Sequence, residues 1–124
     1  MTQNGALGEQ FAAAYLKKQG YCILDTNFNT RFGEIDIIAQ RDDILAFVEV
    51  KTRAANMLAT PATAVTPTKQ KKLIKAALQY LQMHPNDLQP RFDVVSIVTA
   101  SKDGFAVMDI THLADAFDAT TPQF

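Results

Sequence analysis

Four charged side chains stand within two apolar segments of the sequence, at a spacing that could build a catalytic site. They are Glu34, Asp36, Glu49 and Lys51. An ionised carboxylate among apolar residues is costly unless it takes up a proton or finds a positive partner. All-oxygen ligands suit Mg²⁺, which is usually bound through one or two carboxylates and keeps several waters. The pattern therefore predicts either two acids that share a proton or a site for a divalent cation.

The pairing of the two segments brings these side chains together. Residues 33–38 and 45–51 are predicted strands, joined by a two-residue loop at Asp42 and Asp43. Antiparallel pairing from that loop predicts three facing pairs: Ile38 with Phe47, Asp36 with Glu49, and Glu34 with Lys51. Directly facing Cβ atoms lie about 5 Å apart, so the two acids would repel each other. An exposed sheet edge with solvated acids is the alternative, but apolar residues on both faces of both strands favour a covered site.

A first helix is predicted over residues 5–19 and ends at Gly20. Its apolar stripe is formed by Leu7, Phe11 and Tyr15 and widened by Ala12 and Leu16. Glu9 lies at the border of that stripe, where it could turn toward the core or stay in water. From position alone a solvated glutamate is favoured, because the helix dipole stabilises acids in the first turn.

A second helix begins with Thr66 as the N-cap and Pro67 as the first helical residue, and it ends near His84, before Pro85. Its inward stripe consists of Leu73, Ile74, Ala77 and Leu81. Gln70 falls on the same stripe, one turn earlier, and an amide in that place needs hydrogen-bonding partners such as a water or a carboxylate.

Basic residues near this helix are candidates for phosphate contacts. The helix carries Lys69, Lys71, Lys72 and Lys75. A solubilising lysine face is the common reason for such a patch. Here the patch follows an uncharged stretch, residues 54–65. It also opens a helix whose N-terminus can itself attract phosphate. We read that stretch as a loop near the acidic end of the sheet. Arg31, in the turn before the acidic strand, fits a phosphate contact and a plain surface arginine equally well.

The remaining elements complete an α/β fold. Further strands are predicted at 21–28, 91–98 and 105–110, with a closing helical turn at 112–118 and a frayed tail from about residue 118. The order predicts a mixed five-stranded sheet with helices on both faces, in a single domain over residues 1–124. Asp93 and Asp109 are expected to be structural. His84 and His112 are expected at a helix end or on the surface, because neither has a companion at metal-ligand spacing.

Composition limits the classes of function. The net charge of −1 gives no whole-molecule argument for nucleic acid, so such an argument needs a local patch. The single cysteine, Cys22, excludes an internal disulfide, fits a reducing compartment and is expected to be a small buried residue. No signal peptide or membrane-spanning run is recognised, so a cytoplasmic protein without a membrane partner is expected.

Five motifs, in order, resemble the YraN family of bacterial proteins, also called UPF0102. They are Gly5-Ala6-Leu7-Gly8-Glu9, Gly33-Glu34-Ile35-Asp36, Phe47-Val48-Glu49-Val50-Lys51-Thr52-Arg53, Ala64-Val65-Thr66-Pro67-Thr68-Lys69-Gln70 and Arg91-Phe92-Asp93-Val94-Val95. An acid on a helix, then Asp, then Glu-x-Lys, then a helix, is similar to the PD-(D/E)XK nuclease superfamily. The family is held to be a distant relative of archaeal Holliday-junction resolvases. The resemblance covers the chain from about Gly5 to Phe117 and implies a restriction-endonuclease-like fold.

The resemblance implies a role for each matching acid. Asp36 and Glu49 would bind Mg²⁺ or Mn²⁺, with the carbonyl of Val50 as a third ligand. Glu9 would complete the acidic cluster, which favours its inward orientation over the solvated one. Glu34 matches the family motif, but the resemblance assigns it no direct role.

The resemblance also assigns roles to Lys51 and Gln70, whereas the basic candidates of the second helix and Arg31 come from the sequence reading above. Lys51 would orient the attacking water or offset charge on the phosphate, and Gln70 would be the polar helix residue that supports the site. The catalytic candidates are thus Glu9, Asp36, Glu49, Lys51 and Gln70. The nucleic-acid-binding candidates are Arg31, Arg53, Lys69, Lys71, Lys72 and Lys75.

The implied function is metal-dependent hydrolysis of DNA phosphodiester bonds, with branched or junction DNA as the suggested substrate. The same resemblance suggests a homodimer, because a DNA junction presents two symmetric sites of cleavage. Two other functions stay open. One is a nucleic-acid-binding module of nuclease fold with little or no catalysis, and the other is a protein-interaction domain with a structural cation.

Overall fold

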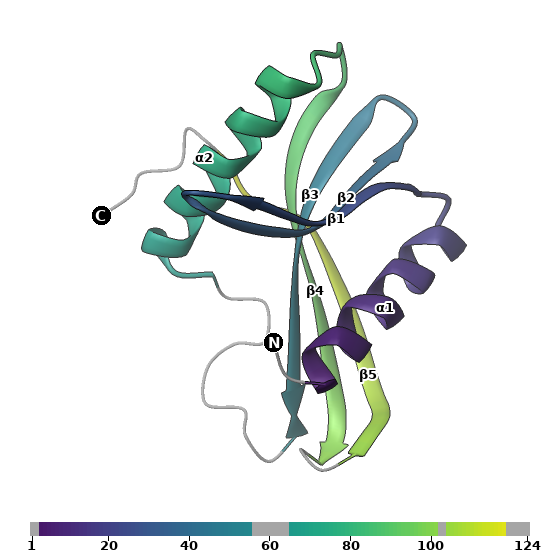
Figure 1. Cartoon of the computed structure of the whole chain (residues 1–124). Helices are drawn as coiled ribbons and strands as arrows, with labels where there is room; N and C mark the ends of the chain where they lie inside the picture. Colours follow the sequence, from purple (N-terminus) through teal and green to yellow (C-terminus); the bar gives the residue numbers. More distant parts are fainter. Residues whose placement is uncertain (1–2, 56–64, 102–103, 119–124) are drawn as a thin grey trace.

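A mixed five-stranded sheet forms the centre of the protein (Figure 1). The computed structural model describes residues 3–55, 65–101 and 104–118. The strands, in their order across the sheet, are β1 (Cys22–Thr30), β2 (Gly33–Arg41), β3 (Ile44–Ala54), β4 (Gln89–Ser101) and β5 (Gly104–Phe117). Only β3 and β4 run parallel, and the chain between them supplies the crossover through a helix. The predicted α/β class and mixed sheet are confirmed.

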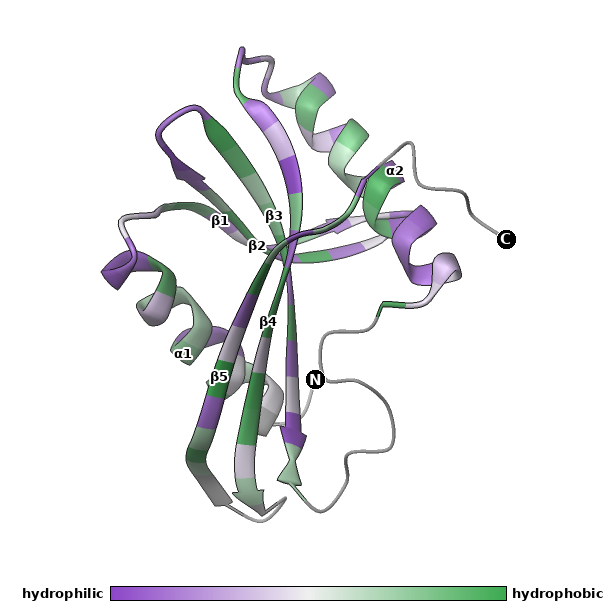
Figure 2. Ribbon diagram, turned by 180° about the vertical axis from the view of Figure 1, so that it is seen from behind, coloured by the Kyte–Doolittle hydropathy of each residue, from purple (hydrophilic) through white to green (hydrophobic). Residues whose placement is uncertain are grey.

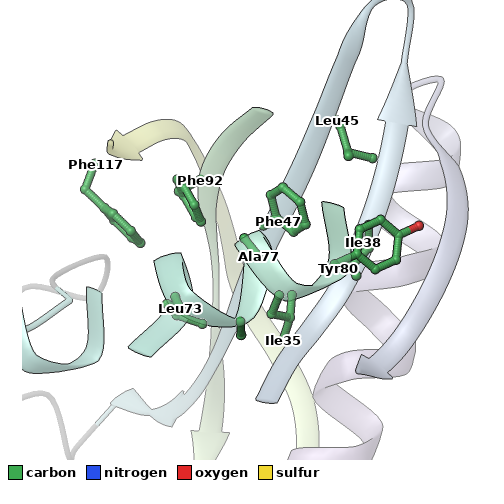
Figure 3. Close-up of a cluster of buried hydrophobic side chains, with 10 residues drawn as sticks. Ile35, Ile38, Leu45, Phe47, Leu73, Ala77, Tyr80, Phe92 and Phe117 are labelled. Atoms are coloured by element: carbon green, nitrogen blue, oxygen red, sulfur yellow. The ribbon is translucent and has the colours of Figure 1, made fainter. Parts of the chain in front are cut away.

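Two helices cover opposite faces of this sheet. α1 (Gln3–Lys18) packs on one face, where Ala12 and Leu16 join a buried cluster with residues of β2, β3 and β4. α2 (Pro67–Met83) packs on the other face, where Leu73 and Tyr80 meet Phe47 of β3 (Figure 3). Thr66 caps α2 as predicted, because its hydroxyl oxygen accepts a hydrogen bond from the Lys69 N–H at 3.2 Å.

The buried stripe of α1 differs from the predicted one. Ala12 and Leu16 are fully buried, whereas the side chain of Phe11 is 38% exposed. The reason is the close approach of α1 to β3 at Gly8. A Cβ atom on Gly8 would lie 1.9 Å from the Thr52 hydroxyl oxygen, so the face with Gly8, Ala12 and Leu16 lies against the sheet, while Tyr15 packs beside the cluster and Phe11 turns outward.

β2 leaves β3 part of the way along its length. The predicted register is confirmed, since Ile38 pairs with Phe47, but the pairing stops at Ile37 and Val48. Beyond that point β2 pairs only with β1, and Glu34 faces Asn29 there and not Lys51 as predicted. The two-stranded ribbon swings over α2 (Figure 1), where the Phe28 and Tyr80 ring centroids lie 5.2 Å apart. The acidic residues thus lie at a split in the sheet.

The C-terminal segment is a strand, so the predicted helical turn at 112–118 is wrong. Asp93 on β4 explains the difference, because it holds β5 in place. Its carboxylate lies 2.8 Å from His112 Nε2 and accepts a hydrogen bond from the Asp115 N–H at 3.0 Å. His112 is therefore mostly buried and not a surface residue, whereas the structural role predicted for Asp93 is confirmed.

Two further expectations concern single places in the chain. Cys22 is exposed and not buried as predicted, because it lies at the start of β1, the edge strand of the sheet. Most of the predicted loop between β3 and α2 (56–64) and the predicted frayed tail (119–124) lie outside the described residues. Among the described helices, none is long and apolar enough to cross a membrane.

Candidate acidic active site

Asp36 lies at the split between β2 and β3 and is 8% exposed. Where the regular pairing has ended, its side chain takes over a backbone partner: the Val50 N–H donates to Asp36 Oδ2 at 2.8 Å. Glu49, one residue before Val50, is hydrogen-bonded to the Asp36 carboxyl group. The split therefore places the two predicted metal-binding acids in contact.

Glu9 reaches the same place from α1. One carboxylate oxygen each from Glu9, Glu34 and Asp36 lies within 4.8 Å of the others. Gly8 permits this arrangement, because it brings α1 against β3 next to the split. Glu9 is thus partly buried in the cluster. Its helix position alone had favoured a solvated side chain, so that expectation is wrong.

Asn27 on β1 is a member of the cluster that sequence reasoning missed. With its amide nitrogen turned toward the acids, it donates to Glu9 Oε1 at 2.8 Å and lies 3.3 Å from Glu34 Oε1. Its backbone has φ = 52°, a left-handed conformation that asparagine adopts more readily than most residues. The sequence signalled only a turn-forming residue, because contact with α1 and β2 depends on how the ribbon folds over.

The acids of the cluster raise one another's proton affinity. Burial, the hydrogen bond with Glu49 and the charges of Glu49 and Glu9 together raise the pKa of Asp36 to about 8. Burial and the neighbouring Glu34 raise the pKa of Glu9 as well, against the hydrogen bond from Asn27. The site therefore holds more negative charge than it can stabilise alone, as the sequence predicted, and a proton or a cation would relieve it.

Basic residues approach the acids from the α2 side. Lys69 Nζ lies 3.5 Å from Glu49 Oε2, and these two residues line one hollow with Lys51, Val65 and Thr66. Burial and the charge of Arg53 lower the pKa of Lys51, against the attraction of Glu49. The predicted Glu-x-Lys pair of β3 thus opens onto a surface hollow beside the acids.

Gln70 supports the rim of this hollow. Its amide nitrogen donates to the Val65 carbonyl oxygen at 2.9 Å. Gln70 is partly buried, as its position on the inward stripe predicted, and a backbone carbonyl is one of the partners that its amide needs. It therefore holds the start of α2 in place next to Glu49 and Lys51.

The other basic candidates gather over the N-terminal half of α2, which Figure 2 colours mainly hydrophilic. Lys71, Lys72 and Lys75 line a hollow of about 450 Å³ together with Arg31, Phe32 and Thr68. α2 contains no acidic residue, so its lysines are not neutralised within the helix. Arg53 lies apart from this group, two residues beyond Lys51 on β3.

Comparison with known proteins gives a family but no activity. Residues 8–97 match the profile described as "Uncharacterised protein family UPF0102". A UPF0102 protein of Chlorobium phaeobacteroides is 45% identical over 118 residues, covering 93% of each chain. One of Syntrophomonas wolfei is 46% identical, covering 91% of this chain and 96% of its own, and one of Syntrophus aciditrophicus is 52% identical, covering 78% and 80%. The matched range, residues 8–97, spans the positions of all five catalytic candidates.

Proposed function

The chain belongs to the UPF0102 family, and from its acidic cluster we propose that it is a metal-dependent endonuclease that hydrolyses phosphodiester bonds of DNA. One observation carries the proposal. The buried Asp36 carboxylate is crowded by Glu9 and Glu49, with a pKa of about 8, at the floor of a site that basic residues border. Strongly perturbed acids in such a place are characteristic of functional sites.

The donor atoms fit a hard divalent cation. Glu9, Glu34 and Asp36 offer carboxylate oxygens within 4.8 Å of one another, and Glu49 adds a fourth acid. Asp36 and Glu49 would hold Mg²⁺ or Mn²⁺, with the Val50 carbonyl as a third ligand. A bound cation of this kind polarises a phosphate and lowers the pKa of a water.

The remaining residues of the site would manage charge and orientation. Hydrolysis joins the oxygen of a water to phosphorus, breaks one ester P–O bond and leaves a proton on the departing oxygen. Lys51 would orient the attacking water or offset the charge that develops on the phosphate. Its lowered pKa favours the first task, because the neutral amine can accept a hydrogen bond from the water, whereas charge offset needs the ammonium form. Gln70, through Val65, would keep the hollow open beside Lys51.

Binding of DNA would rest on the basic surface of α2 and its neighbours. Lys71, Lys72, Lys75 and Arg31 line one hollow, and Arg53 lies beyond Lys51. Phosphate contacts of this kind give affinity without sequence preference, and they weaken steeply with salt. We therefore expect recognition of DNA shape, with four-way junctions and flaps as the first branched substrates to test.

The test is cleavage of labelled four-way junction, flap, single-stranded and linear duplex DNA with Mg²⁺ and then with Mn²⁺. The wild type should cut at least one of them, and Asp36→Ala, Lys51→Ala and EDTA should each abolish cutting. Loss in both variants distinguishes this activity from a contaminating nuclease. Cutting that survives Asp36→Ala would overturn the proposal.

A DNA-binding module of nuclease fold is the second candidate, and the Lys69–Glu49 ion pair favours it. Lys69 balances one acid without a metal, and a proton on Asp36 could balance another. Under this function, replacing the lysines from Lys69 to Lys75 should abolish binding while Asp36→Ala leaves it unchanged. Salt-dependent DNA binding by a wild type that never cuts would select this function over the first.

A further inference from the structure

We propose that the turn between β1 and β2 is a stacking platform for an unpaired base, so that the substrate must present single-stranded DNA next to the cut. The inference rests on the proposed nuclease function and names the class of substrate. The platform is the ring of Phe32, held by its neighbours Arg31 and Lys75.

Two cations lie over the ring of Phe32. The guanidinium carbon of Arg31 lies 4.9 Å from the ring centroid, and Lys75 Nζ lies 5.6 Å from it. Phe32 is only partly buried. The ring also borders two hollows at once, one of about 640 Å³ with Leu78 and one of about 450 Å³ with Lys72. Both cations belong to exposed side chains, so a base that stacks on the ring can take the place of one of them, and the displaced cation can then hold the adjoining phosphate.

Hydrogen bonds order the backbone of the turn that carries the ring. The Thr30 hydroxyl oxygen accepts hydrogen bonds from the Phe32 N–H at 3.0 Å and the Gly33 N–H at 3.1 Å, and it donates to the Gly33 carbonyl at 2.9 Å. Gly33 has φ = 154° and packs beside Lys72 of α2. A platform that is already ordered loses little entropy when a base binds.

The platform connects to the acidic site along α2. Lys69 contacts Glu49, while Lys75, six residues later, contacts Phe32. Six helical residues span about 9 Å, which corresponds to about two to three nucleotides of a strand in helical geometry. From the other side, Glu34 of the acidic cluster lies two residues after Phe32. A strand whose phosphates follow the lysines would therefore reach Phe32 a few nucleotides from the acids.

An unpaired base fits this platform better than a duplex does. In a duplex both faces of each base are covered by its neighbours, and only phosphates and groove edges are exposed. The lysines could contact a duplex backbone, but the Phe32 ring would have no base face to meet. Stacking of one base on an aromatic side chain contributes about 1–3 kcal/mol, which is about 5- to 150-fold in affinity.

The test measures binding of the wild type and Phe32→Leu by fluorescence anisotropy, in EDTA so that no strand is cut. The two DNAs are a blunt duplex and the same duplex with a short single-stranded tail. We expect tighter binding to the tailed DNA, a loss of about 10-fold in Phe32→Leu on the tailed DNA alone, and wild-type affinity in Phe32→Tyr. Leucine keeps the apolar contact with α2, and Phe11→Leu, on the opposite face, is the matched control.

A change in the DNA makes the test independent of how the variants fold. One abasic nucleotide is moved along the tail. With the abasic nucleotide at one tail position, the affinity of the wild type should fall about 10-fold, whereas the affinity of Phe32→Leu should be the same at every position. Equal effects of Phe32→Leu on both DNAs, or no sensitive position, would overturn the platform. If the wild type cleaves DNA but Phe32→Leu binds as the wild type does, only the platform is overturned and the nuclease function is retained. If the wild type neither binds nor cleaves DNA, both proposals are overturned.

Discussion

The Val50 N–H donates to Asp36 Oδ2 at 2.8 Å at the point where β2 and β3 separate. A side chain thus replaces the backbone acceptor that a continued sheet would have supplied. The hydrogen bond fixes Asp36 beside Glu49, and the opening lets Glu9 approach from α1. The cost of the arrangement is a buried, crowded carboxylate.

Replacing Asp36 with asparagine should stabilise the metal-free protein at high pH. Because the pKa of Asp36 is raised to about 8 in the folded state, its contribution to stability is intact below pH of about 4 and is lost as the pH rises through about 8. Asparagine keeps an acceptor for the Val50 N–H and carries no charge. We expect a gain of about 1–3 kcal/mol at pH 8.5 and little change at pH 4. Urea denaturation in EDTA at both values measures it.

Asp87→Asn is the control for this comparison, since Asp87 is exposed between α2 and β4. It should leave stability unchanged at both pH values. If Asp36→Asn were less stable than the wild type at pH 8.5, the crowding of the acids would not be the dominant effect at this site.

Divalent cations should raise the melting temperature of the wild type but not that of Asp36→Asn. A ligand that binds only the folded state stabilises it, by about 2.7 kcal/mol at a hundred times its dissociation constant. Protons compete for the same carboxylates, so the rise should be larger at pH 8 than at pH 5. Thermal denaturation with Mg²⁺, Mn²⁺ and EDTA measures it. A rise that persists in Asp36→Asn would place the cation elsewhere.

Gly8→Ala should move α1 away from β3. Alanine favours helix by about 1 kcal/mol over glycine, but its Cβ would lie 1.9 Å from the Thr52 hydroxyl oxygen. We expect a net loss of about 1–3 kcal/mol, together with weaker cation binding because Glu9 moves with the helix. Urea denaturation of Gly8→Ala, Thr52→Ala and the double variant gives the coupling free energy between the two positions. Additive effects would contradict a direct clash.

Asp93→Asn should be strongly destabilising. Burial alone would raise the pKa of Asp93, but hydrogen bonds from His112 and Arg91 outweigh it and hold that pKa below its usual value. The contribution of this carboxylate is therefore present above about pH 4 and lost as the pH falls through the lower folded value. Removing its charge leaves Arg91 poorly compensated, at a cost of about 3–5 kcal/mol at pH 7.

Acid and urea denaturation of Asp93→Asn, followed by circular dichroism, measures both effects. Asp109→Asn, an exposed aspartate of β5, is the matched control and should behave as the wild type does. Equal stability of Asp93→Asn and the wild type at pH 7 would show that the network with Arg91 and His112 is not what holds β5.

The sequence by itself determined the elements and their class. Thr66, Pro67 and Gly20 mark helix ends through local backbone chemistry, and the two-residue loop at Asp42 and Asp43 sets the register of Ile38 and Phe47. Such signals act between neighbours in the chain, so they can be read without a structure. The acids on β2 and β3 were recognisable for the same reason, as charges in apolar strands.

Tertiary structure decided how these acids meet. Their closeness depends on the separation of β2 from β3, on the fit of Gly8 against Thr52 and on the fold of the ribbon that carries Asn27 and Phe32. The same is true of β5, where the buried charge of Asp93 outweighs local helix preference. These are contacts between residues far apart in the chain, and their strength depends on burial. Burial exists only once the sheet and both helices have packed together.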